Sequence, residues 1–170
     1  MNILALSGSL RQGSSNTTLL HAAAALAPDG VAVTVYERLG DIPPFNPDLD
    51  ENAPEPVQAF RAVLRAADAV LICSPEYAHG VSGVMKNALD WTVGSGEFIQ
   101  KPVALLNAAP WATFAHSQLT ETIKTMDARV VEEACVAVKI LPKNLGVAGM
   151  VASPEIAPVL RAAVAALALT

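Results

Sequence analysis

Five short apolar runs recur along the chain, and longer segments compatible with helices separate most of them. This alternation predicts an α/β fold with a parallel sheet, because two parallel strands need a long crossover between them, usually a helix. Turn-forming residues close most of the runs, as expected for buried strands. The expected strands are residues 3–6, 31–36, 69–73, 103–106 and 134–140.

The segments between these runs carry the sequence features of helices. In residues 55–67, apolar side chains from Val57 to Leu64 recur at intervals of three and four, which places them on one helix face. Pro54, Pro56 and Pro154 lie where helices begin, since the first turn needs no donor at that position. The expected helices are residues 17–26, 55–67, 82–91, 115–127 and 155–169.

The size of the chain suits one domain. With 170 residues, of which 52% are hydrophobic, it is long enough to bury a sizeable core. No interdomain linker or internal repeat is visible, so we expect a single domain over residues 1–170. The formal charge of -5, without a Lys/Arg cluster, argues against binding nucleic acid or anionic lipid by bulk attraction. Small molecules are the expected partners.

The cysteines and the first residues bear on the cellular compartment. Cys73 and Cys135 lie in apolar stretches without metal-ligand spacing, and we expect both to be reduced core residues. No basic segment with a long apolar run follows Met1, and no apolar run approaches the roughly 20 residues that span a bilayer. The sequence therefore predicts a cytoplasmic protein that is neither exported nor embedded in a membrane.

The first apolar run breaks into a polar loop, SGSLRQGSSNT, at residues 7–17, and an apolar-rich stretch follows. This pattern predicts a strand, a phosphate-binding loop and a helix. Glycines let the backbone turn sharply, and the four serines and Arg11 supply hydrogen-bond donors. The first N–H groups of the helix point at the same spot. We therefore expect a phosphate or sulfate group to bind there.

This loop lacks the residues that nucleotide hydrolysis requires. Gly8 and Gly13 have the GxxxxG spacing of a P-loop, but Ser14 stands where that motif has lysine. A dinucleotide-binding GxGxxG is also absent, because Leu10 occupies its second glycine position. The loop thus predicts a cradle for a monophosphate. Alternatively, it merely turns the chain and caps the helix through a side chain at residues 14–16.

A second polar loop, SPEYAHGVSGVMKNALDW at residues 74–91, follows the third strand and leads into a helix. In a doubly wound sheet of order 2-1-3-4-5, strands one and three are neighbours, and the loops at their carboxyl ends open one crevice. Tyr77 and the nearby backbone could flank a flat ring there. Alternatively, Tyr77 and His79 belong to an ordinary half-exposed loop. The residues expected to face a ligand are Pro75, Glu76, Tyr77, Ala78, His79 and Gly80.

A third loop, residues 107–116, follows the fourth strand, and its Trp111 is a candidate for the far wall of the same crevice. A tryptophan there is alternatively a core or interface anchor. The acid- and proline-rich residues 37–54 predict a surface lid or an oligomer contact. No Ser/His/Asp triad or carboxylate pair can be assembled from the spacing, so chemistry is expected to belong to a cofactor.

The two loop motifs, in this order and separation, resemble those of the flavodoxin-like, NAD(P)H-dependent FMN reductases, which include quinone, azo-dye and chromate reductases. The resemblance covers most of residues 1–140. It implies a flavodoxin-like three-layer sandwich with a five-stranded parallel sheet of order 2-1-3-4-5, and FMN as cofactor. It places the phosphate on Ser9, Arg11, Ser14, Ser15, Asn16 and Thr17, and the isoalloxazine ring beside Pro75, Glu76, Tyr77, His79 and Gly80.

The chain departs from the family pattern at two places. Many relatives carry Asn and a Pro-Gly pair where this chain has His79 and Ser82-Gly83, so we expect different hydrogen bonding near the ring. Many relatives also have a glycine-rich loop in place of residues 107–111, so we expect altered access of nicotinamide to the flavin. The segment that the resemblance assigns to loop shaping and a subunit interface contains Lys86, Asn87 and Asp90.

The resemblance implies an oxidoreductase in which NADPH or NADH donates hydride to FMN, and a quinone-like or other small-molecule electron acceptor then takes the electrons. Two other classes remain open. A flavodoxin-type electron carrier would bind FMN but pass electrons between protein partners. A non-catalytic module would use the phosphate loop for another ligand. Because relatives usually pair, a homodimer or homotetramer is also expected.

Overall fold

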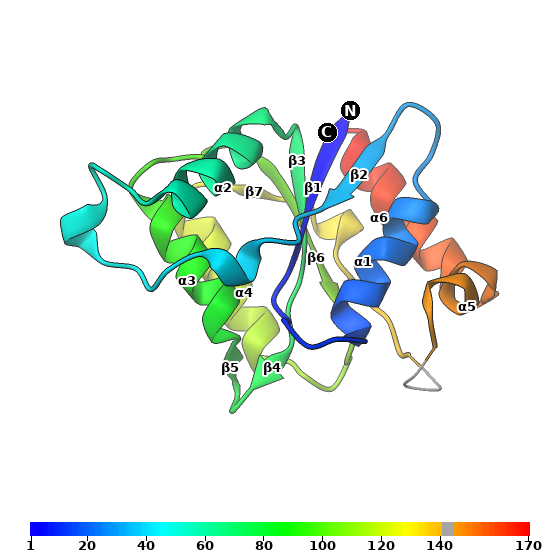
Figure 1. Ribbon diagram of the computed structural model, residues 1–170. Coiled ribbons are helices and arrows are strands. Elements are labelled where there is room, and N and C mark those ends of the chain that lie inside the picture. Colours follow the sequence, from blue (N-terminus) through cyan, green and yellow to red (C-terminus); the bar gives the residue numbers. More distant parts are fainter. Residues whose placement is uncertain (141–144) are drawn as a thin grey trace.

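Six strands form the central sheet in the computed structural model, which describes residues 1–140 and 145–170. The order is β2-β1-β3-β6-β7, with β8 also paired to β6, and it confirms the expected 2-1-3-4-5 arrangement. Helices lie on both sides of the sheet, which gives three layers (Figure 1). The strands are β1 Asn2–Ser7, β2 Ala32–Val35, β3 Ala69–Cys73, β6 Pro102–Asn107, β7 Arg129–Val130 and β8 Val136–Ala137.

The strands β1 and β3 lie next to each other in the middle of the sheet. They pair in parallel from Ile3 opposite Ala69 to Ser7 opposite Cys73. Every residue of β3 is buried, as expected of a strand that helices cover on both faces. Because the two strands end at the same level, the polar loops that follow them leave the sheet side by side. The fold therefore positions a ligand site at this carboxyl edge.

The fifth position of the sheet differs from the sequence prediction. Instead of one strand over residues 134–140, two short strands, β7 and β8, pair with successive parts of β6. Between them the chain leaves the sheet in a 3-10 turn, η3 (Glu132–Ala134). The two glutamates of this turn are exposed, and its alanine is buried. The prediction of a single strand was wrong because the apolar run joins residues that belong to the turn and to the strand.

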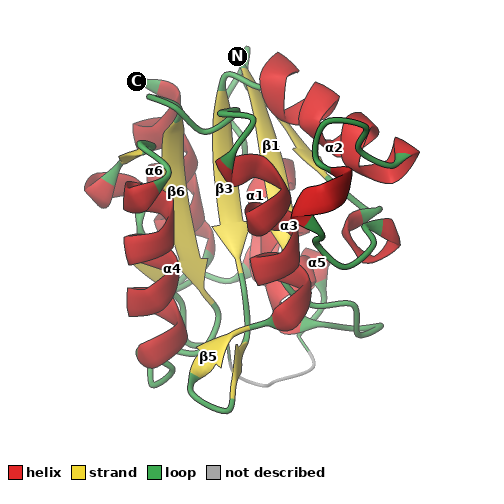
Figure 2. Cartoon of the chain, turned by 90° about the vertical axis from the view of Figure 1, so that its left-hand side faces the viewer, coloured by secondary structure: helices red, strands yellow, loops and turns green. Residues whose placement is uncertain are grey.

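Two sets of helices cover the two faces of the sheet (Figures 1 and 2). Every predicted helix is present, with its ends shifted by at most two residues. One face carries α1 (Ser15–Ala25), α5 (Val147–Ala152) and α6 (Ala157–Ala168), and the other carries α2 (Glu55–Ala66), α3 (Gly83–Val93) and α4 (Phe114–Thr125). The short α5 and the hairpin of β4 (Glu76–Tyr77) and β5 (Gly80–Val81) were not predicted.

Each face of the sheet has its own hydrophobic core. Leu19 and Leu160 are fully buried on the α1 and α6 side, and Phe60 is fully buried on the α2 side. Complete burial of such a side chain contributes roughly 1.5–3 kcal/mol. Cys73 is buried, Cys135 is half-buried, and both are free thiols, as predicted.

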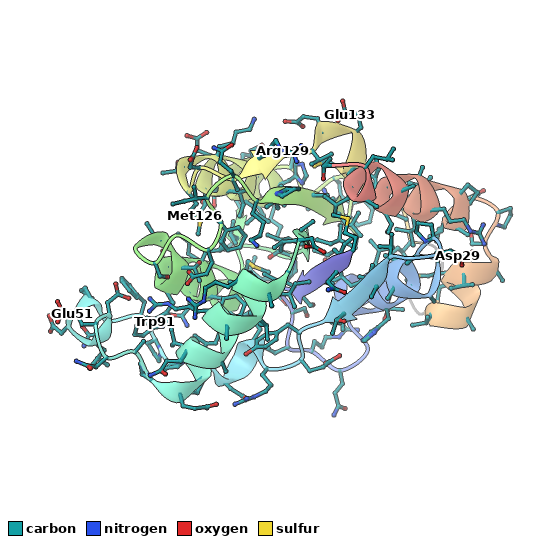
Figure 3. All side chains as sticks on the ribbon, turned by 90° about the horizontal axis from the view of Figure 1, so that it is seen from above. Asp29, Glu51, Trp91, Met126, Arg129 and Glu133 are labelled. Atoms are coloured by element: carbon teal, nitrogen blue, oxygen red, sulfur yellow. The ribbon has the colours of Figure 1, made fainter. Side chains whose placement is uncertain are left out.

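The acidic and proline-rich segment of residues 37–54, which contains the 3-10 turns η1 (Leu39–Asp41) and η2 (Pro47–Leu49), is hydrogen-bonded to α3. The side-chain oxygen of Asn87 accepts a bond from the Phe45 N–H at 2.7 Å. The Trp91 indole N–H donates to the carbonyl of Pro43 at 2.8 Å. In Figure 3, seen from above, Glu51 lies at the far end of this segment, beyond Trp91. Residues of the second motif therefore shape this segment.

The chain termini and the β4–β5 hairpin lie at opposite ends of the sheet (Figure 2). Within residues 1–140 and 145–170, no helix has both the length and the apolar character that crossing a membrane requires. The same residues place no three His, Cys, Asp or Glu side chains together in a way that would hold a metal ion. The polar loops that follow β1 and β3 lie at the hairpin end, where a ligand site is expected.

Candidate functional site

Gly8 lies where the two polar loops meet. Its N–H donates to the Cys73 carbonyl at 2.9 Å. A Cβ atom on Gly8 would lie 2.3 Å from Ser74 Oγ and 2.8 Å from Ser82 Oγ, closer than real Cβ atoms approach other atoms. Glycine is therefore required for this approach. The loops that the sequence assigned to one crevice do lie together.

The first loop is stabilised mainly by contacts within itself. Ser7 Oγ and Thr17 Oγ1 lie 2.7 Å apart, and the Ser14 N–H donates to the Arg11 carbonyl at 3.2 Å. Gly13 has a φ of +67°, a conformation that glycine adopts without strain. Ser14 is the N-cap of α1, but its side chain makes no capping bond. The alternative interpretation, in which this loop only turns the chain and caps the helix, is therefore not supported at Ser14.

A cavity of about 400 Å³ lies beside this loop, toward β2. Arg11 lines it, is exposed, and forms no ion pair with any residue that the structure describes. Its five N–H donors are therefore available to an anion. The predicted phosphate-binding residues that line this first cavity are Ser9, Arg11, Ser14 and Thr17.

Other residues that line the first cavity were not predicted, among them Tyr36, His21 and Glu37. Tyr36 lines it, and the Tyr36 hydroxyl is buried without a hydrogen-bond partner among the described residues. Burial raises the pKa of this phenol. At the rim, His21 Nε2 lies 3.4 Å from Glu37 Oε1. Tyr36 closes a run predicted to be a strand, and nothing in the local pattern marks it as a site residue.

A second cavity, of about 280 Å³, lies on the other side of the α1 N-terminus, toward β3 and β6. It brings together residues from all three polar loops, as the sequence predicted for a common crevice. Four predicted site residues line it: Ser15, Asn16, Pro75 and Glu76. The third loop contributes Asn107, Ala108, Ala109, Trp111 and Ala112.

Tyr77, His79 and Gly80 line neither of these two cavities. They belong to the β4–β5 hairpin, whose turn residues Ala78 and His79 have φ angles of 50° and 59°. Positive φ at both turn positions matches the right-handed twist of a two-residue hairpin. Non-glycine residues adopt these angles only at an energetic cost, so the surrounding structure must hold the turn. The expected place of a ring beside these three residues stays a prediction.

Contacts from α4 hold this hairpin. The carboxylate of Glu76 accepts a backbone N–H from the first turn of α4 at 2.9 Å. The His79 ring stacks on Phe114 with 4.4 Å between the ring centroids and 18° between the planes. The Gln118 side chain donates to the His79 carbonyl at 3.2 Å and accepts the Val81 N–H at 3.4 Å. Phe114 and Gln118 belong to neither motif, and no local pattern indicates their role.

The third loop is a tight turn held by Asn107. The Asn107 side chain accepts the Ala109 N–H at 2.8 Å and donates to the Ala112 carbonyl at 3.0 Å. The Ala112 N–H also donates to the Ala109 carbonyl at 2.7 Å, which closes the turn around Pro110 and Trp111. Trp111 lines the second cavity and is 65% exposed. It is therefore a wall of the crevice and not a core residue.

Cys73 is hydrogen-bonded to a residue of the second cavity but is not reactive. Its thiol donates to Asn16 Oδ1 at 3.2 Å. Burial raises the pKa of this thiol to about 12, and burial also raises the pKa of Cys135. A protonated thiol is a poor nucleophile, so neither cysteine is placed for covalent chemistry at neutral pH.

A doubly wound parallel sheet with polar loops after two adjacent central strands defines a flavodoxin-like ligand-binding domain. The family model for NADPH-dependent FMN reductase matches residues 1–141, and the chain belongs to this family. The family resemblance of the two loop motifs is thereby confirmed.

Individual relatives agree with this assignment. A probable NADPH:quinone oxidoreductase 2 of Oryza sativa subsp. japonica is 44% identical over 95 residues, which are 54% of this chain and 47% of the rice protein. An NAD(P)H-dependent FMN reductase of Pseudomonas aeruginosa is 41% identical over 112 residues, 64% of this chain and 60% of that protein. The chain thus spans about half to three fifths of the length of these relatives.

A solved structure covers nearly the whole chain. It is that of FerB, a flavoenzyme NAD(P)H:(acceptor) oxidoreductase from Paracoccus denitrificans. The TM-score is 0.80 and the identity 26%, and the match covers 98% of this chain and 94% of FerB. The described fold, including its last helices, is therefore shared with this flavoenzyme.

Proposed function

We propose that this protein is an NAD(P)H-dependent oxidoreductase that uses FMN and passes the electrons to a small oxidant. The observation that carries the proposal is the pair of cavities on either side of the α1 N-terminus. One contains the unpaired guanidinium of Arg11, and the other is walled by Trp111. An anion-binding end next to a partly apolar end suits a ligand made of a phosphate and a ring system.

The donors around α1 fit a phosphate dianion. The first backbone N–H groups of a helix have no partner within the helix, and the helix dipole favours negative charge at the same place. Arg11 adds a permanent positive charge. We infer that the phosphate is held by the six predicted residues that line the two cavities around this helix end, Ser9, Arg11, Ser14, Ser15, Asn16 and Thr17.

The second loop suits the ring end of the cofactor. We infer that Pro75 and Glu76 flank the flavin ring and that Tyr77, His79 and Gly80 lie at its outer edge. The Glu76 carboxylate already accepts a backbone N–H from α4, so it orients the loop. Bound FMN supplies the hydride-accepting and electron-donating chemistry. The residues of the chain bind it, orient it and limit the access of water.

The names of relatives support a small-molecule acceptor. The rice relative is named for NADPH and quinone, and FerB is named for an unspecified acceptor. A partly open cavity with an apolar wall suits a quinone-like oxidant. We propose NADPH or NADH as the hydride donor.

The test is to saturate the purified protein with FMN, remove free flavin, and add NADPH or NADH in the absence of oxygen. We expect the flavin to be retained, its visible absorption to bleach rapidly, and the colour to return when a quinone is added. A flavodoxin-type carrier would retain flavin that bleaches only slowly. A non-catalytic phosphate-binding module would retain no flavin. Either of these last two results would contradict the proposal.

We also propose that the protein works in the cytoplasm as a homodimer or homotetramer. The two free thiols support a reducing compartment. Large apolar side chains that are about half exposed, such as Val93 and Ile99, support association between copies. Light scattering measures the molecular mass directly, and a monomer at micromolar concentration would contradict the oligomer.

A further inference from the structure

We propose that Trp111 determines acceptor specificity, because its indole ring stacks on flat aromatic acceptors and gives no such contact to compact, non-planar ones. The inference rests on the function proposed above and assigns the preference to one side chain. Trp111 takes no part in electron transfer on this view. Its effect is on binding of the acceptor, and therefore on KM.

Trp111 has contact area that no other aromatic group uses. The side chain is 65% exposed, although it lines the 280 Å³ cavity with Pro75 and Glu76. Aromatic contacts among the described residues pair Tyr36 with Phe60, Phe45 with Trp91, and His79 with Phe114, and none of them includes Trp111. A large apolar ring at the mouth of a cavity, without a stacking partner, is suited to a ligand that supplies one.

The backbone that carries the indole is fixed in advance. Asn107 bonds to both ends of the turn, at Ala109 and Ala112. Pro110, the residue before the tryptophan, has its φ angle fixed by its own ring. An aromatic side chain has only two side-chain torsions to restrict when a ligand arrives. Stacking therefore loses little conformational entropy, as in rigid aromatic binding surfaces.

The remaining lining of the cavity favours a thin ligand. The third loop presents the small side chains of Ala108, Ala109 and Ala112, and the second loop presents Pro75. Because these side chains are short, none of them can surround a bulky ligand. Hydrogen-bonding groups come from Ser15, Asn16 and Glu76 at the edges. This lining suits the planar flavin ring assigned to the cavity above, and the exposed indole face of Trp111 is then the contact that remains for an acceptor.

The first test compares two acceptors in Trp111→Ala, Trp111→Phe and a control, Phe45→Ala. Phe45 is also an exposed aromatic residue, at 38%, but it lies in the segment of residues 37–54 and lines neither cavity. The acceptors are 2-methyl-1,4-naphthoquinone, which is flat, and ferricyanide, which is not. We expect Trp111→Ala to raise KM for the naphthoquinone about three- to tenfold and to leave ferricyanide within about twofold. Trp111→Phe keeps most of the parent's preference for the naphthoquinone, and Phe45→Ala leaves the ratio of the two KM values unchanged.

A second test needs no turnover. The chain has two tryptophans, so a ¹H–¹⁵N spectrum shows two indole N–H peaks, and Trp111→Phe identifies one of them. When the naphthoquinone is added to oxidised, FMN-loaded protein without NADPH, the Trp111 peak should shift until it saturates. The peak of Trp91, whose side chain is fully buried, should stay in place.

The outcomes separate this inference from the proposed function. Retained flavin, with an unmoved Trp111 peak or equal KM changes for both acceptors, overturns the specificity role and leaves the oxidoreductase intact. A change of molecular mass in Trp111→Ala shows that the indole is a contact between copies, which also overturns the role. Protein that retains no flavin overturns both.

Discussion

The loop after β1 and the hairpin after β3 lie side by side, but different parts of the chain stabilise them. The first loop closes on itself, with Ser7 bonded to Thr17 and Ser14 to Arg11. The hairpin depends on α4, and the Gln118 that bonds to His79 is 39 residues away along the chain. A local motif thus specifies the phosphate end of the site, whereas tertiary packing specifies the ring end. The two ends should therefore respond differently to substitution.

The largest effect is expected where the two regions meet. Gly8→Ala forces a Cβ atom into Ser74 and Ser82, and overpacking of this kind costs about 3 kcal/mol of unfolding free energy. FMN retention should fail with it, since both loops must shift. Urea unfolding measures the stability. Gly83→Ala is the matched control, because an added Cβ there meets nothing within 4 Å, and it should leave the stability unchanged or slightly higher. Equal losses in both variants would contradict the close approach.

Arg11→Ala should weaken FMN without weakening the fold. Loss of a charge-assisted bond costs about 1.5–3 kcal/mol, roughly a tenfold to hundredfold rise in the dissociation constant. Arg11 is exposed, so the unfolding free energy from urea denaturation should stay within about 0.5 kcal/mol of the parent value. Fluorescence titration of flavin-free protein measures the affinity. Arg161→Ala removes an exposed arginine that lines neither cavity, and it should change neither quantity much. Parent-like affinity in Arg11→Ala would remove this residue from the phosphate site.

The buried thiol of Cys73 should make the unfolding free energy depend on pH. Its pKa is raised by burial from 9.0 to about 12, so above about pH 9 the unfolded chain has released a proton that the folded chain keeps. The unfolding free energy should therefore fall as pH rises from 9 toward 12, by about 1.4 kcal/mol per pH unit. Cys73→Ala should be less stable at neutral pH but should lose stability less steeply in this range. Urea midpoints between about pH 8 and 10 compare the two slopes, and equal slopes would contradict the assignment.

Glu76→Ala should loosen the hairpin and the start of α4 together. The carboxylate accepts a backbone N–H at the helix N-terminus, and loss of such a bond costs about 1 kcal/mol. Glu76→Gln keeps an acceptor oxygen and should lose less than half as much. Thermal or urea unfolding gives both values. A loss in Glu76→Gln as large as in Glu76→Ala would show that the charge, and not the acceptor, is what matters.

The smallest effect on stability is expected for Gln118→Ala. Both of its bonds to the hairpin are partly exposed, so the global cost should stay near 0.5 kcal/mol. Hydrogen exchange at the Val81 N–H should nevertheless become about tenfold faster, while the Ser14 N–H in the first loop keeps its rate. Glu121→Ala, an exposed change on the same helix, is the control and should leave both amides unchanged. Equal acceleration in the two loops would remove the distinction between them.

The parts of the fold that sequence alone predicts are those with a local pattern. The buried run of β3 and the turn-rich loop after β1 each show their character within about ten residues, and the alternation of runs predicts a parallel sheet. Gly8 was identified with the first loop because its neighbours form a recognisable motif. The strand order came from the family resemblance, and that order predicted that the polar loops lie together.

Features that depend on distant residues were missed. Residues 134–140 predicted one strand, because nothing in the run shows that residues further upstream also reach β6. The stacking of His79 on Phe114 was not predicted either, because Phe114 belongs to another element. Tyr36 also reaches the first cavity only because β2 lies beside β1. Packing between elements decides each case, and local propensity carries no information about it.

The division of the fifth sheet position between β7 and β8 has a consequence for solubility. Each of these strands has only two residues, and η3, with its exposed glutamates, separates them. An open sheet edge invites another chain to add a strand, and long apolar edges lead to aggregation. Here the edge offers only brief stretches of backbone, and negative charge interrupts them. This border of the sheet is thereby protected against edge-to-edge assembly into fibrils.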